Sequence, residues 1–295
     1  MPTAVIAFDF DPLLRLAEGL VVRWQTLALA AAIAATLILA ALIARRGTLR
    51  LDDMLFIAVG TVPGAVIAGR LGYLLLHFEY YAANPSAILD PGLGAMELAF
   101  GVVGGLLTGS YVASLLGAPV GRWWHSAVLP VLILLGLGKL TMILGGAGQG
   151  MPSAAPWATA FLGPGPWGSL APALPSDPSQ AYESIATLVV LVAVMLALAF
   201  GAFGRRDGRV LFAALAAWAF ARAAVSTTWR DAAVVGPLNM GTLMAIGVGV
   251  GCLLFLGTLT ARARRTPAGA PSVPSASAGG DRGLSWPDPS TRPPF

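Results

Sequence analysis

Seven long apolar runs constrain the fold of this chain more than any other feature of its sequence. They lie at about residues 25–44, 55–78, 98–117, 125–146, 184–203, 210–228 and 237–260. An α-helix needs about 20 predominantly apolar residues to cross the hydrocarbon core of a bilayer. Only 11% of the 295 residues are charged, whereas soluble globular proteins carry roughly 25%. The sequence therefore predicts an all-α integral membrane protein with seven transmembrane helices.

Arginines in the connecting segments predict how the chain is oriented. They follow the first, third, fifth and seventh runs: Arg45, Arg46, Arg50, Arg122, Arg205, Arg206, Arg209, Arg262, Arg264 and Arg265. Residues 79–95 and 147–183 contain no lysine or arginine. Because cytoplasmic loops carry the excess of cations, we expect an external N-terminus, an external loop at 147–183 and a cytoplasmic C-terminus.

The rest of the composition narrows the class of protein. Residues 1–265 are predicted to form one membrane domain, and residues 266–295, rich in Pro, Ser, Ala and Gly, a disordered cytoplasmic tail. The net charge of +4 lies mainly in loops and tail, which favours contact with anionic lipid rather than nucleic acid. The single cysteine, Cys252, lies in an apolar run and is expected to pack there. No cluster of His and Cys predicts a metal site.

Charged residues inside the apolar runs point to a functional interior. Arg70, Lys139 and Arg222 have apolar sequence on both sides, and a charge at the centre of a membrane helix costs roughly 2.5–3.5 kcal/mol on insertion scales. The runs supply few anions to balance them, chiefly Glu183 and Glu97. A phosphate-bearing ligand is a natural counter-charge, since arginine binds phosphate through two parallel hydrogen bonds.

Six motifs, in chain order, carry a family resemblance. They are "FDPLL" (10–14), "AGRLGYLL" (68–75), "GLGKLTMILGGAGQG" (136–150), "PSQAYE" (178–183), "FARAAVSTTWRD" (220–231) and "NMGTLMAI" (239–246). Together they resemble the prolipoprotein diacylglyceryl transferase family of bacterial inner (plasma) membranes, over about residues 8–260. Seven spans with an external N-terminus also agree with that family.

The resemblance implies an activity. The family moves a diacylglyceryl group from phosphatidylglycerol to the lipobox cysteine thiol of a preprolipoprotein, with no metal or organic cofactor, and releases glycerol phosphate. That chemistry needs cations around the leaving phosphate and a base that generates thiolate. Carried over by motif, the implied catalytic residues are Glu183, Lys139 and Arg222. The implied substrate-binding residues are Arg70, Tyr73, Gly150, Ser179, Gln180, Tyr182 and Arg230.

Several positions depart from the family pattern. A tyrosine, a histidine, an arginine, an asparagine, a glutamate, a second histidine and a second glutamate are replaced here by Gln25, Ala99, Lys139, Met142, Ala147, Asp177 and Ser226. The cations survive while acid–base groups are lost. Three interpretations within the family stay open: a divergent transferase, a related transferase with another acceptor or lipid, and a weak or inactive member that binds anionic phospholipid or lipoprotein signal segments. A fourth, an unrelated seven-span transporter, is disfavoured by the ordered motifs.

Two carboxylates remain as candidate bases, Glu97 and Glu183, and the geometry of a regular helix favours one of them. Glu97 precedes Ala99 by two residues, so on a regular helix it points to roughly the opposite face and is a poor base, unless the segment is irregular, which the glycines at 92, 94 and 101 permit. Glu183 is therefore the expected base. At the start of the same run, Ser179 or Asp177 is predicted to cap the fifth helix, with Gln180 or Glu183 completing the interaction.

Overall fold

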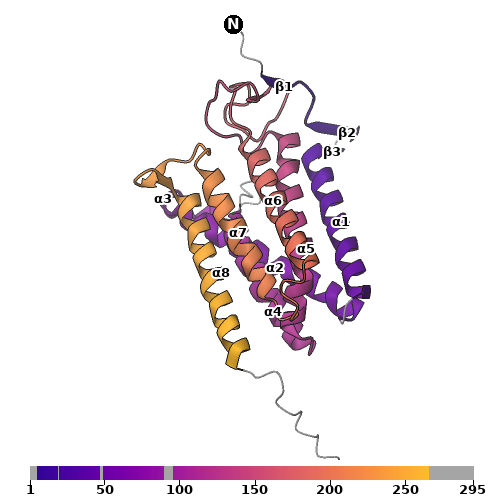
Figure 1. The fold of residues 1–295 in the computed structure, drawn as a ribbon. Coiled ribbons are helices and arrows are strands. Elements are labelled where there is room, and N and C mark those ends of the chain that lie inside the picture. Colours follow the sequence, from indigo (N-terminus) through magenta and orange to yellow (C-terminus); the bar gives the residue numbers. More distant parts are fainter. Residues whose placement is uncertain (1–4, 19, 47–48, 90–95, 266–295) are drawn as a thin grey trace, which may run out of the picture.

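The described part of the chain contains seven membrane-length helices, which form the body of the protein (Figure 1). The computed structural model describes residues 5–18, 20–46, 49–89 and 96–265. The long helices are α1 (Trp24–Arg46), α2 (Leu51–Leu76), α4 (Leu98–Leu115), α5 (Val120–Thr141), α6 (Ser179–Ala199), α7 (Arg209–Ser226) and α8 (Met240–Arg265). The predicted fold class and number of spans are confirmed. Shorter pieces are α3 (Phe78–Ala83) and the 3₁₀ turns η1 (Pro85–Leu89) and η3 (Met142–Gly145).

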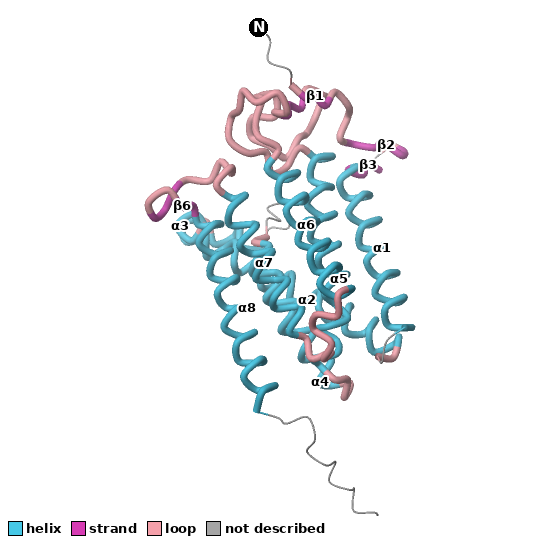
Figure 2. The backbone as a smooth tube through the Cα atoms, in the orientation of Figure 1, coloured by secondary structure: helices cyan, strands magenta, loops and turns pink. Residues whose placement is uncertain are grey.

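The two ends of the bundle differ in character. One end, here called the loop end, carries strand β1 (Ile6–Phe8) and the long connection between η3 and α6 (Figure 2). α8 finishes at the opposite end, where α1 also ends with Arg45 and Arg46 (Figure 1). The assignment of the loop end to the outer face of a membrane stays a prediction from the arginine pattern. The predicted tail, 266–295, lies outside the described residues.

Short strands at the loop end were not predicted from the sequence. β1 pairs in parallel with β4 (Thr159–Phe161), while β2 (Leu13–Ala17) and β3 (Leu20–Arg23) form a hairpin, as do β5 (Ala233–Val235) and β6 (Leu238–Asn239). Phe8 stacks on Phe161 with ring centroids 5.1 Å apart. The β1–β4 pair joins segments about 150 residues apart, so local sequence patterns carry no signal for it.

Glycines bring α2 and α4 into close contact. A Cβ atom on Gly64 would lie 2.5 Å from the backbone oxygen of Gly104, closer than real Cβ atoms approach. A Cβ on Gly109 would lie 2.5 Å from the ring of Trp123, which belongs to α5. The spacing Gly101, Gly105 and Gly109 thus serves helix packing, as small residues do in membrane proteins.

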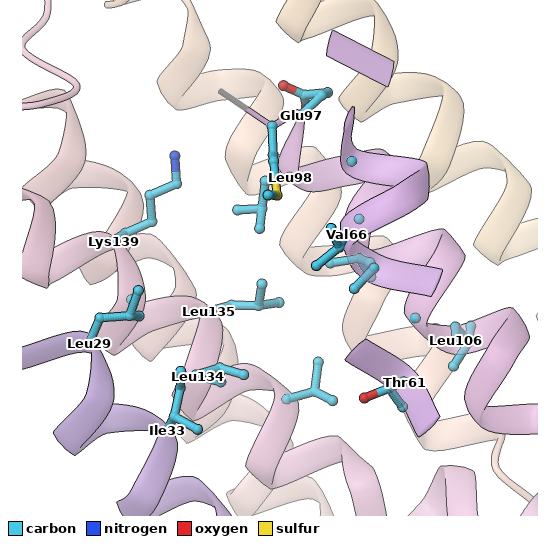
Figure 3. A pocket seen from close by; sticks show the side chains of 18 of the residues that line it. Leu29, Ile33, Thr61, Val66, Glu97, Leu98, Leu106, Leu134, Leu135 and Lys139 are labelled. Atoms are coloured by element: carbon cyan, nitrogen blue, oxygen red, sulfur yellow. The ribbon is translucent and has the colours of Figure 1, made fainter. Parts of the chain in front are cut away.

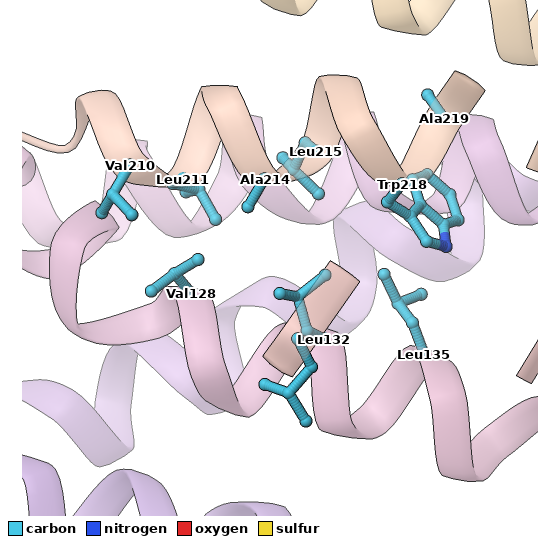
Figure 4. Packing of buried hydrophobic residues seen from close by; sticks show 10 residues of the cluster. Val128, Leu132, Leu135, Val210, Leu211, Ala214, Leu215, Trp218 and Ala219 are labelled. Atoms are coloured by element: carbon cyan, nitrogen blue, oxygen red, sulfur yellow. The ribbon is translucent and has the colours of Figure 1, made fainter. Parts of the chain in front are cut away.

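A packed apolar core holds α5 against α7 (Figure 4). Val128, Leu132 and Leu135 of α5 face a row on α7 made of Val210, Leu211, Ala214, Leu215, Trp218 and Ala219. Helices in lipid gain little from apolar burial alone, and their association depends on close van der Waals packing. This contact fixes Lys139, at the end of α5, relative to Arg222 on α7.

The sequence placed the start of the fifth span too late. α6 begins at Ser179 rather than near 184, so the predicted loop 147–183 ends at Pro178. Ser179, Gln180 and Glu183 are each at most 2% exposed, because neighbouring helices surround the first turn of α6. A hydropathy pattern assigns such polar residues to a loop, although they are interior.

The capping prediction for this helix is wrong as well. Pro178 occupies the cap position, and no side chain caps the helix. The hydroxyl of Ser179 instead lies 2.6 Å from that of Thr228. The side-chain oxygen of Asp177 is directed to the Tyr182 hydroxyl, at 3.5 Å.

Candidate functional site

Four charged side chains meet inside the bundle, three from helices α5, α6 and α7 and one from the residue before α4, and we call them the charge cluster. Arg222 of α7 is 2% exposed and lies at the centre. Its Nη1 donates to Oε1 of Glu183, and its Nη2 lies 3.1 Å from Oε1 of Glu97. Lys139 of α5 approaches Oε2 of Glu183 at 3.0 Å. The structure therefore brings the three predicted catalytic residues together and adds Glu97.

The charge cluster is formally neutral, since it holds two cations and two carboxylates. Mutual pairing is what makes four charges tolerable in this interior, where an unpaired buried charge is strongly destabilising. The indole ring of Trp229 further stabilises the two cations. Its ring centre is 4.7 Å from the Arg222 guanidinium carbon and 5.5 Å from Lys139 Nζ, within the range of cation–π attraction.

Glu97 reaches the charge cluster because it precedes α4 instead of lying within it. Its backbone is extended, with φ −86° and ψ 117°, and its carboxylate accepts a hydrogen bond from the Ala99 amide at 3.2 Å. Its own amide donates to the carbonyl of Gly69 at 2.8 Å, which ties it to α2. The expectation for a regular helix, that Glu97 points away, therefore does not apply, and the alternative of an irregular segment is the one observed, because Glu97 precedes the first turn of α4. The glycines near it were the available signal.

A cavity of about 550 Å³ opens beside the charge cluster, between α1, α2, α4, α5 and α7 (Figure 3). Its walls are mostly apolar and include Leu29, Ile33, Val66, Leu106, Leu134 and Leu135. Lys139 and Glu97 lie together at one end of it (Figure 3). Gln25 of α1, at the family's tyrosine position, also lines the cavity. Arg222 and Glu183 are bonded to the two charged lining residues.

A structural junction at the loop end, here called the outer clamp, consists of Gly150, Ser176, Ser179, Thr228 and Arg230. Three of these, Gly150, Ser179 and Arg230, are predicted substrate-binding residues. Arg230 donates from Nε to the Gly150 carbonyl and from Nη2 to the Ser176 hydroxyl, both at 2.6 Å. The Gly150 amide donates to the carbonyl of Asp177 at 2.7 Å. The outer clamp fastens the η3–α6 connection to the ends of α6 and α7.

The other four predicted substrate-binding residues have separate surroundings. Arg70 donates to the Ile88 carbonyl at 3.0 Å, and Tyr73 stacks on His77 with centroids 4.1 Å apart. The Tyr182 hydroxyl accepts a hydrogen bond from the indole of Trp157 at 2.6 Å. Gln180 is buried, and its amide has no hydrogen-bond partner within the described residues. None of the seven is among the described residues that line the cavity. Their role in substrate binding stays a prediction.

Ser226, which stands where the family has a glutamate, joins two helices. Its hydroxyl lies 2.6 Å from that of Thr242 on α8, and its carbonyl accepts a hydrogen bond from the side-chain amide of Asn239 at 2.7 Å. Asn239 in turn accepts from the Thr242 amide at 2.8 Å. This position contributes to the α7–α8 contact and supplies no acid or base.

Comparison with known proteins agrees with the motifs. The family model for prolipoprotein diacylglyceryl transferase matches residues 12–258. The chain belongs to this family.

Individual relatives show how far the similarity extends. A phosphatidylglycerol–prolipoprotein diacylglyceryl transferase of Geobacter sulfurreducens is 30% identical over 209 residues, covering 68% of this chain and 76% of the relative. The Gluconobacter oxydans protein of the same name is 30% identical, covering 80% and 86%. That of Nostoc sp. is 26% identical and covers 92% and 98%. The similarity thus extends over the whole seven-helix body.

Proposed function

We propose that this protein transfers the diacylglyceryl group of phosphatidylglycerol to the lipobox cysteine thiol of a preprolipoprotein, in the inner membrane of a bacterium. Family membership and the names of the relatives support the reaction. Seven apolar helices support a multi-pass membrane location. The arginine pattern supports an outer-face position for the loop end, with the N-terminus external and the C-terminus cytoplasmic.

The observation that carries the proposal is a cavity that is apolar along its walls and charged at one end. About 550 Å³ is within the range of small-molecule sites, roughly 300–1,000 Å³. The apolar walls suit the hydrocarbon part of a lipid. The end formed by Lys139 and Glu97, with Arg222 directly bonded to Glu97, suits its phosphate and the reacting thiol.

The two cations have a defined task in this reaction. As the bond between the glycerol carbon and the phosphate oxygen breaks, negative charge grows on the leaving glycerol phosphate. Preorganised donors in a site that excludes water stabilise such charge far better than they would in water. Lys139 lines the cavity and contacts the phosphate directly. Arg222 lies behind it and can bind the phosphate once a carboxylate no longer pairs with one of the two Arg222 amino groups.

Complementation tests the proposed function. Cells depleted of their own transferase should regain growth when they express this chain, and mass spectrometry should find the diacylglyceryl group on lipobox cysteines. The control is a double variant, Lys139→Met with Arg222→Gln, expressed to the same level, which should fail in both assays.

An absence of modified lipoprotein at full expression of the parent chain would contradict the proposal. The alternative of a lipid-binding member without catalysis would then be supported by anionic phospholipid that co-purifies with the parent and is lost from the double variant.

A further inference from the structure

The two carboxylates of the charge cluster are held in unequal ways. Glu183 has both oxygens engaged, Oε1 with Arg222 and Oε2 with Lys139. Glu97 receives both of its partners, Arg222 and the Ala99 amide, on Oε1. Within the described part of the chain, no hydrogen bond or ion pair reaches Oε2 of Glu97. Glu97 also lines the cavity, and Glu183 does not.

We propose that Glu97 is the proton acceptor that generates the acceptor thiolate, in place of the histidine that this chain lacks at Ala99. The inference rests on the proposed function, because it assigns one step of that reaction. A base must come within hydrogen-bond reach of the proton it removes. Glu97 is the carboxylate that meets the cavity at its charged end, so a thiol entering there encounters it before Glu183.

The proposed step balances in atoms and charge. The thiol proton passes to the Glu97 carboxylate, and the thiolate sulfur attacks the glycerol carbon that bears the phosphate. A carbon–sulfur bond forms while the carbon–oxygen bond breaks, and the oxygen leaves with the electron pair on glycerol phosphate. The proton then passes from Glu97 to solvent or to the departing phosphate, which restores the carboxylate.

Proton uptake by Glu97 also makes the net charge of the cluster more positive as the glycerol phosphate leaves. Arg222, Lys139 and Glu183 are the charged groups that face Glu97, from α7, α5 and α6. Once Glu97 is neutral, the formally neutral cluster carries one net positive charge. Nη2 of Arg222 is then released from its carboxylate partner just as the phosphate gains its second negative charge. Glu97 thus acts as the base, and its protonation also frees Nη2 of Arg222 to bind the phosphate.

The dependence of rate on pH distinguishes a base from a structural carboxylate. We would measure transfer by the purified full chain in phosphatidylglycerol vesicles to a lipobox peptide. Without a base, Glu97→Gln must rely on thiolate formed in solution, and a cysteine thiol has a pKa of about 8.5. The loss for Glu97→Gln should be about 100-fold at pH 6.5 and shrink about tenfold per pH unit toward pH 8.5, with the KM for phosphatidylglycerol not raised.

Two matched changes complete the test. Glu79→Gln makes the same substitution at an exposed glutamate on α3 and should leave the rate unchanged at every pH. Glu97→Asp keeps a negative charge facing Arg222 but withdraws the carboxylate by one methylene; we expect about a tenfold loss. A peptide with selenocysteine carries a more acidic nucleophile, so the losses of both Glu97 variants should largely disappear with it.

The outcomes separate this inference from the proposed function. A parent rate unchanged in Glu97→Gln, or a loss that is the same at every pH and persists with selenocysteine, would overturn the role of Glu97 and leave the transferase activity standing. A folded parent chain without any transfer would overturn the proposed function and this inference with it. If Glu97→Gln does not fold, the selenocysteine comparison in Glu97→Asp decides the question.

Discussion

The charge cluster and the outer clamp each contain an arginine from the same sequence motif, and the two arginines have opposite surroundings. Arg222 pairs with two carboxylates beside the cavity, whereas Arg230 donates to a carbonyl and a hydroxyl that hold a loop. Arg230 follows Arg222 by eight positions, so an electrostatic centre and a structural junction lie close together in the chain. A motif kept in sequence therefore carries two tasks, and each can be tested by removing one arginine.

The largest effect is expected from Arg222→Gln. This change removes the donor shared by Glu97 and Glu183 and leaves Lys139 alone with two carboxylates. Loss of one preorganised donor commonly costs about 100- to 1,000-fold in rate. We expect a fall in kcat/KM of at least that size for transfer to a lipobox peptide. A loss below tenfold in folded protein would place the phosphate contact elsewhere.

The rate of transfer should depend on the positive charge of Lys139 more than on the shape of its side chain. Lys139→Met removes the cation at the end of the cavity and should lower kcat/KM about 100-fold, by the same loss of a donor to developing charge. Lys139→Arg, the residue that the family has here, keeps the charge and should stay within about tenfold of the parent. Equal losses in the two variants would show that the site depends on the lysine side chain itself.

At the outer clamp, Gly150→Ala should affect stability before rate. A Cβ atom on Gly150 would lie 2.5 Å from the Thr228 carbonyl oxygen and 3.0 Å from that of Asp177. Overpacking of this kind typically costs about 1–3 kcal/mol, so the thermal unfolding midpoint in lipid or detergent should fall by several degrees. The matched control is Gly247→Ala in α8, where a Cβ meets nothing within 4 Å. A midpoint unchanged by Gly150→Ala would show that the junction is loose.

The smallest effect on rate is expected from Arg230→Gln. This variant loses the hydrogen bonds that tie Gly150 and Ser176 together. We expect transfer within about tenfold of the parent, and faster limited proteolysis between residues 151 and 176. A rate loss as large as that of Arg222→Gln would contradict the separation of the two regions and return Arg230 to the substrate site.

The sequence predicted the helices well because their signal is local. Apolar length alone identified seven spans, and charges flanked by apolar residues identified Lys139 and Arg222. The same reasoning failed for the start of α6, where Gln180 and Glu183 are polar in sequence but enclosed by other helices. Which neighbours surround a first turn is decided by packing, and no window of hydropathy contains that information.

Glu97 shows a second limit of sequence reasoning. The sequence shows a charged residue beside an apolar run, but the direction of its side chain depends on where α4 begins. An extended backbone and a hydrogen bond to Gly69 on α2 turn its side chain toward Arg222. Both features arise from the contact between two helices, so the residue could be listed as a candidate from sequence but not placed.

Transfer by the purified protein tests the central claim most directly. The full chain would be placed in phosphatidylglycerol vesicles with a lipobox peptide, and both products would be quantified by mass spectrometry. The account predicts a peptide that carries one diacylglyceryl group on its cysteine, with one glycerol phosphate released for each, and predicts that the Arg222→Gln variant forms little of either. An unmodified peptide after incubation with folded parent protein would contradict it.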